Sequence, residues 1–169
     1  MEIVIREAKP SDAGQLIAYV QRLTEEPDSN IELSPGEFTL TAADEKKILT
    51  DYARSGNSIY LVAEVGENIV GILICTGGNR RAVRHVTTLG MSVDRLWRGK
   101  GIGNKLIAEA ITWAKSTEVL TRIELFVLER NERAIHLYRK FGFEIEGRKR
   151  KAIFRDGKYL DEFIMALLL

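Results

Sequence analysis

Apolar and polar residues alternate in seven stretches of the chain, which is the pattern of half-buried β-strands. The predicted strands are Ile3–Arg6, Ser58–Val65, Ile69–Thr76, His85–Val93, Arg122–Leu128, Phe143–Phe154 and Lys158–Leu168. Gly66-Glu67-Asn68 indicates a short hairpin between the second and third strands. Asp156-Gly157 between the last two strands indicates a type I′ turn.

Helical signals lie between these strands. The predicted helices cover residues 10–24, 41–54, 104–115 and 131–141. The first has an apolar face at helical spacing, formed by Ala13, Leu16, Ile17, Val20 and Leu23. Thr41 followed by Asp44 is a capping pair for the second helix, and Gly142 ends the fourth.

The order of these elements is strand, two helices, three strands, helix, strand, helix and two strands. This order predicts an α/β sandwich with a mixed sheet that begins as a meander, crosses over in the middle and ends in a hairpin. The length of 169 residues argues for one domain, residues 1–169.

Composition excludes several classes of protein. The chain is 45% hydrophobic and 29% charged, as soluble globular proteins are, and its net charge of +1 creates no field that attracts nucleic acid or membranes. No signal peptide or membrane span is visible, so we expect a cytoplasmic protein. Cys75 is expected to be a buried thiol in an apolar strand, and no cluster has metal-ligand spacing, so we expect no metal.

The stretch Arg98-Gly99-Lys100-Gly101-Ile102-Gly103 lies between a predicted strand and a predicted helix. Its glycines allow the backbone to approach a ligand closely, and the first amides of the helix have no partner within the helix. The helix dipole adds partial positive charge at the same point. These features predict a phosphate or pyrophosphate site.

The spacing of this loop excludes two common phosphate motifs. Gly103 is followed by Asn104 rather than by Lys-Ser/Thr, and the third glycine of the dinucleotide pattern is missing. The spacing Arg98-x-x-Gly101-x-Gly103 instead resembles the pyrophosphate loop of the GCN5-related N-acetyltransferases, which bind acetyl-coenzyme A. A second stretch is similar to another signature of that family, Asn131-x-x-Ala134-x-x-Leu137-Tyr138-x-x-Phe141-Gly142-Phe143. The resemblance extends from about Arg84 to the C-terminus.

The resemblance implies a fold and a binding site. The fold is a mixed, mostly antiparallel sheet of about seven strands flanked by about four helices. Acetyl-CoA would be the cosubstrate, with its pyrophosphate at the amides between Arg98 and Gly103. Its pantetheine arm would bond to the backbone of Met91, Ser92 and Val93 on a strand that separates from its neighbour. The family often pairs its last strands across subunits, which implies a homodimer.

Two side chains of the second signature have implied roles. Asn131 matches the asparagine that approaches the pantetheine arm, and it is also a good helix N-cap. Tyr138 matches the tyrosine that gives a proton to the leaving thiolate, and the alternative is an aromatic side chain packed in the core.

The general base is not evident. Many relatives carry a glutamate where this chain has Thr88, and threonine is no base at neutral pH. Glu32 and Glu124 are candidate carboxylates, a water chain is the alternative, and His85 and His136 titrate in the right range.

The implied function is direct transfer of an acetyl group to a primary amine of a small molecule or a protein N-terminus, in a ternary complex. The acidic loop Glu25–Phe38 suits a cationic acceptor, and a solvated loop is the alternative. The run Arg148–Lys151, two residues on each strand face, indicates a charged sheet edge rather than a nucleic-acid site. A non-catalytic coenzyme-binding module and a different nucleotide binder are the competing functions.

Overall fold

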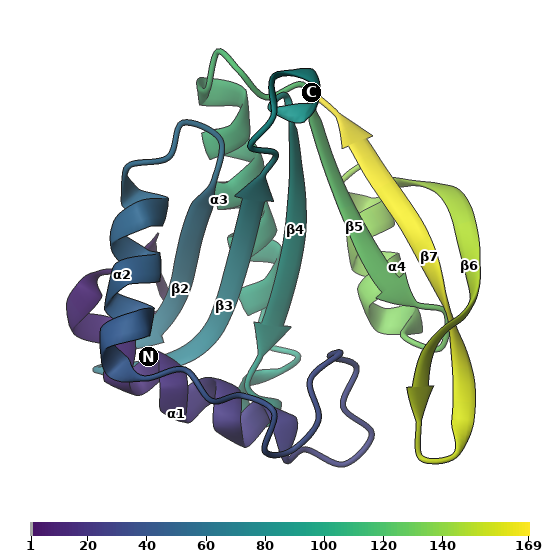
Figure 1. Cartoon of the computed structure of the whole chain (residues 1–169), viewed down its shortest axis with the longest axis horizontal. Coiled ribbons are helices and arrows are strands. Elements are labelled where there is room, and N and C mark those ends of the chain that lie inside the picture. Colours follow the sequence, from purple (N-terminus) through teal and green to yellow (C-terminus); the bar gives the residue numbers. More distant parts are fainter. Residues whose placement is uncertain (1) are drawn as a thin grey trace.

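Within residues 2–169, which the computed structural model describes, seven strands form one sheet in the order β1-β2-β3-β4-β5-β7-β6 (Figure 1). The strands are β1 Val4–Glu7, β2 Ile59–Val65, β3 Asn68–Gly77, β4 Val86–Val93, β5 Arg122–Leu128, β6 Glu144–Arg155 and β7 Lys158–Leu168. Every neighbouring pair is antiparallel except β4 and β5. The predicted α/β fold with a mixed, mostly antiparallel sheet is confirmed.

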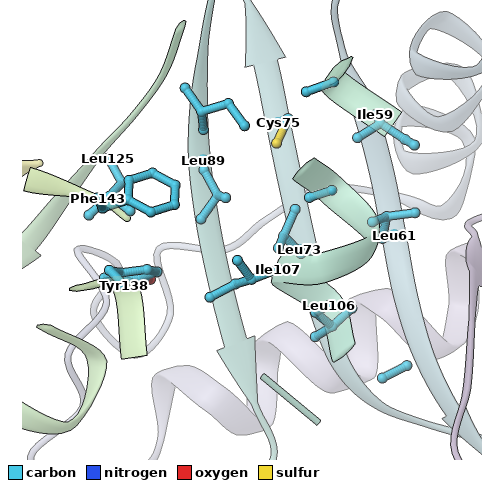
Figure 2. Close-up of a cluster of buried hydrophobic side chains, with 14 of the residues drawn as sticks. Ile59, Leu61, Leu73, Cys75, Leu89, Leu106, Ile107, Leu125, Tyr138 and Phe143 are labelled. Atoms are coloured by element: carbon cyan, nitrogen blue, oxygen red, sulfur yellow. The ribbon is translucent and has the colours of Figure 1, made fainter. Parts of the chain in front are cut away.

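Four α-helices in the same residues cover the two faces of the sheet: α1 Ala13–Thr24, α2 Ala42–Ala53, α3 Ile102–Ser116 and α4 Glu132–Lys140. Helices α1 and α2 pack on one face, where Leu16 of α1 and Leu49 of α2 belong to one hydrophobic cluster with Val62 of β2. Helices α3 and α4 pack on the other face, and Figure 2 shows Leu106 and Ile107 of α3 against the sheet. Helix α1 therefore buries the apolar face that its sequence pattern predicts, except at Ile17.

Strands β4 and β5 pair only at one end, and this opening positions the site. Val86 to Thr88 pair with Arg122 to Glu124, and the described residues show no pairing between the two strands beyond that point. Figure 1 shows the two strands diverging toward the C-terminal end of β4. Strand β3 holds the other side of β4 as far as Val93. Residues 89–93 of β4 therefore keep one backbone edge that pairs with no strand among residues 2–169.

The predicted caps and turns are confirmed. Thr41 and Asp44 form the capping box of α2. Asp156 and Gly157 both have positive φ, 50° and 74°, as a type I′ turn requires. Gly142, with φ of 90°, follows the last residues of α4 in the left-handed conformation that ends helices.

Three sequence expectations require correction. Helix α3 begins at Ile102, two residues earlier than predicted, because Gly101 has the left-handed conformation and caps it. On α1, Ile17 is only half-buried and Tyr19 is buried instead. In β6 the register shifts between Lys149 and Ile153, so the basic run does not alternate regularly between two faces.

Cys75 is buried within β3, and that burial raises the pKa of its thiol to about 12. Strand β6 forms an edge of the sheet, so its basic residues lie on a charged edge. No helix among residues 2–169 combines the length and apolar character needed to cross a membrane.

Candidate functional site

A cavity of about 520 Å³ opens where β4 ends and α3 begins. It brings together ten of the predicted coenzyme residues: Met91, Ser92, Val93, Arg98, Gly99, Gly101, Ile102, Gly103, Asn131 and Tyr138. Lys100 is not among its wall residues, and the ammonium of Lys100 lies 4.4 Å from the centroid of the Trp97 ring. We call this space the coenzyme cavity.

The glycines of the loop shape one wall of the coenzyme cavity. Gly99 and Gly101 both have φ of 82°, a conformation that other residues adopt at a cost. A Cβ on Gly103 would lie 3.0 Å from the Leu137 side chain and 3.5 Å from that of Met91. The absence of side chains here leaves the first-turn amides of α3 open to an anion.

The Arg98 guanidinium is held at the rim of the coenzyme cavity. Its Nε donates to the Val93 carbonyl at 2.8 Å, and one terminal nitrogen donates to the Glu26 carboxylate at 2.5 Å. Glu26 follows α1 and lines the same cavity. The pairing of Glu26 with Arg98 joins positions 72 residues apart, and no local sequence pattern indicates it.

Tyr138 packs in the core and also lines the coenzyme cavity. Its ring packs in the core, 5.7 Å from the Phe143 ring, and Figure 2 shows the two side by side near Leu125. The side chain is 6% exposed, and this burial raises the pKa of the phenol to about 12. Tyr138 therefore keeps its proton throughout the neutral and mildly alkaline range, while it lines the coenzyme cavity.

Asn131 caps α4, because its Oδ1 accepts from the Ala134 amide at 3.3 Å. Asn131 also lines the coenzyme cavity. The cap uses the side-chain oxygen, so the amide nitrogen is left to act as a donor to a ligand.

A second cavity of about 570 Å³ lies against α1 and α2 and reaches across to β7. We call it the acceptor cavity. The two spaces meet at seven shared wall residues, which are Leu23, Asn30, Ile31, Met91, Ser92, Asn131 and Tyr138. Tyr19 of α1 fixes this meeting point, since its hydroxyl lies 3.0 Å from the Ser92 hydroxyl.

The acidic loop forms a wall of both cavities, and two arginines that the sequence did not single out hold it. Arg130 donates to the Ser29 carbonyl at 3.2 Å and to the Asn30 side chain at 3.2 Å. Arg155, from the β6–β7 hairpin, donates to the carbonyls of Ser29 and Ile31. The loop is therefore a positioned element of the site.

The candidate general bases do not lie together in one cavity of the site. Glu32, Thr88 and Glu124 line a third cavity of about 720 Å³, and of these three only Glu32 also lines the acceptor cavity. The Glu124 carboxylate accepts two hydrogen bonds from Arg122, at 2.9 and 3.0 Å. His136 is exposed, as the sequence indicated for it, and lines the coenzyme cavity. His85 is exposed, and it is not among the described residues that line the three cavities.

The chain is similar in sequence to known N-acetyltransferases. The L-amino acid N-acetyltransferase AaaT of Escherichia coli K12 is 38% identical over 106 residues, 63% of this chain and 65% of that protein. The [ribosomal protein uS5]-alanine N-acetyltransferase of the same organism is 26% identical over 122 residues, 71% of this chain and 62% of that protein. The chain thus spans less than two thirds of the length of these curated relatives.

A solved structure and a family model cover more of the chain. The crystal structure of a GNAT-family acetyltransferase from Streptococcus pneumoniae superposes with a TM-score of 0.95 at 36% identity, over 99% of both chains. The model described as "Acetyltransferase (GNAT) family" matches residues 19–143. The chain belongs to the GNAT acetyltransferase family.

Proposed function

We propose that this protein is an acetyl-CoA-dependent N-acetyltransferase that acetylates a primary amine of a small molecule or of a protein N-terminus while both substrates are bound. The meeting of two cavities at Met91, Ser92, Asn131 and Tyr138 is the observation that carries the proposal. The coenzyme cavity has a glycine loop and open helix amides that can bind an anion, and the acceptor cavity has apolar and acidic walls. The names of the two curated relatives, both N-acetyltransferases, support the same reaction class.

The residues of the coenzyme cavity fit acetyl-CoA. The side-chain-free positions Gly99, Gly101 and Gly103 leave room for a pyrophosphate at the start of α3, and Arg98 adds a cation at the rim. The backbone edge of β4 that lacks a strand partner gives an extended pantetheine arm amides and carbonyls to bond. Acetyl-CoA would supply the acetyl group in activated form, as a thioester.

The chain's own residues would then protonate the leaving thiolate and deprotonate the acceptor amine. Tyr138 holds a proton at its hydroxyl, next to the point where the two cavities meet, and is suited to donate it to a departing thiolate. Deprotonation of the amine is assigned to Glu32, because it lines the acceptor cavity while Glu124 is occupied by Arg122.

A panel of primary amines, assayed by release of free thiol from acetyl-CoA, tests this function. We expect acceptor-dependent thiol release with at least one amine and none without an acceptor. A protein that binds coenzyme A in calorimetry but releases no thiol with any amine is the non-catalytic module. Tighter binding of ATP or NAD than of coenzyme A would instead indicate a different nucleotide binder.

A further inference from the structure

The walls of the acceptor cavity are apolar and acidic. Its described wall residues include three carboxylates, from Glu32, Glu45 and Glu162, and no lysine, arginine or histidine. The rest of the wall is largely hydrophobic or aromatic, with Phe38 and Tyr60 among its larger side chains. Such a surface favours a ligand with an apolar body and positive charge, and it repels a carboxylate.

Glu45 differs from the other two carboxylates. It is 3% exposed, and no hydrogen bond or ion pair to its side chain occurs among residues 2–169, whereas Glu162 is paired with Lys149 at 3.1 Å. Burial raises the pKa of Glu45. A buried carboxylate normally has a partner, so this one, in the wall of the cavity, is placed to receive the cation of a ligand.

The position of Glu45 separates it from the reacting centre. Glu45 is on α2, close enough to Tyr60 of β2 for its charge to add to the effect of burial in raising the pKa of that phenol. Tyr60 pairs with Ile74, and Ile74 pairs with Gly90 of β4. Two strand spacings, about 10 Å, therefore lie between the Glu45 end of the cavity and the residues beside Gly90 where the two cavities meet.

We infer that the acceptor is an elongated amine without a carboxylate, whose second cationic nitrogen binds Glu45 at one end of an apolar spacer while its primary amine reacts at the other. This inference rests on the proposed function and specifies its substrate class. It separates this chain from one that takes a free amino acid, the substrate in the name of the Escherichia coli relative. An amino acid would bring a carboxylate into a cavity whose described wall residues include carboxylates and no lysine, arginine or histidine.

Three acceptors of one length test the inference, since they differ only at the far end. They are 1,8-diaminooctane, octylamine and 8-aminooctanoic acid, which present an ammonium, a methyl group and a carboxylate to Glu45. Thiol release at saturating acetyl-CoA should give kcat/KM in that order. We expect the diamine to exceed octylamine by about ten-fold, the scale of one charge-assisted contact.

Two variants assign the preference to one side chain. Glu45→Gln keeps the shape and removes the charge, so the ten-fold advantage of the diamine over octylamine should fall to about two-fold or less. Glu109→Gln removes an exposed charge on α3, outside the acceptor cavity, and should keep the full advantage. Circular dichroism melts of both variants establish that they are folded.

Equal or better use of 8-aminooctanoic acid than of the diamine would overturn the inference, as would an unchanged preference in folded Glu45→Gln. In both cases thiol is released and the proposed function stands. Absence of thiol release with every acceptor, from a protein that binds coenzyme A, would remove the proposed function and the inference together.

Discussion

Replacing Tyr138 with phenylalanine should lower kcat at least ten-fold and leave the affinity for coenzyme A within about two-fold. The substitution keeps the ring that packs on Phe143 and removes only the hydroxyl at the meeting point of the cavities. General acid catalysis contributes about 10²–10⁴-fold, and a phenol whose pKa is about 12 remains protonated at every practical assay pH. Steady-state thiol release and calorimetric titration measure the two quantities.

Tyr159→Phe is the matched control, because it removes a hydroxyl from a side chain that is 61% exposed on the β6–β7 hairpin. This variant should retain full kcat. A Tyr138→Phe enzyme with unchanged kcat would remove Tyr138 from the mechanism and leave it only its packing role.

Gly101→Val should weaken coenzyme A binding by about 30-fold or more. Gly101 caps α3 with φ of 82°, and a β-branched residue at that angle forces the loop to shift. The shift turns first-turn amides away from the pyrophosphate, and each charge-assisted hydrogen bond lost costs about 1.5–3 kcal/mol. Calorimetric titration of the variant with coenzyme A gives the change in Kd.

Gly157→Val separates this effect from loss of stability. Gly157 also has positive φ, 74°, and at both glycines the space that a Cβ would enter is open. Both variants should therefore lose a similar amount of stability, about 1–2 kcal/mol, in thermal melts. Only Gly101→Val should lose affinity for coenzyme A. Equal losses of affinity in both variants would mean that the glycine loop before α3 has no specific role in binding the coenzyme.

The parts of the fold that the sequence predicts are those with local signals. Thr41 with Asp44, Gly142 and Asp156-Gly157 each fix a backbone conformation through their own chemistry, and all are found where the pattern indicated. The coenzyme loop is of the same kind, since its glycines and the helix after it are contiguous. The helix begins two residues earlier than predicted because Gly101 caps it, which places Ile102 in the helix rather than in the loop.

Of the acceptor side the sequence predicts only the acidic loop, because distant pairings build the rest. Arg130 and Arg155 fix the acidic loop from positions more than 90 residues away, and no spacing rule relates them to it. Glu45 has the pattern of an ordinary first-turn acid, which helix dipoles favour. Its buried place in a cavity becomes visible only when α2 is packed against β2.

The turn between β4 and α3, together with the backbone edge of β4, should bind the pantetheine-bearing nucleotide. Calorimetric titration of the unmodified protein with coenzyme A tests it most directly. We predict saturable binding to a single site per chain, tighter than the binding of ATP or NAD under the same conditions. A titration without heat of binding at millimolar coenzyme A, confirmed by an unchanged melting temperature, would contradict the account.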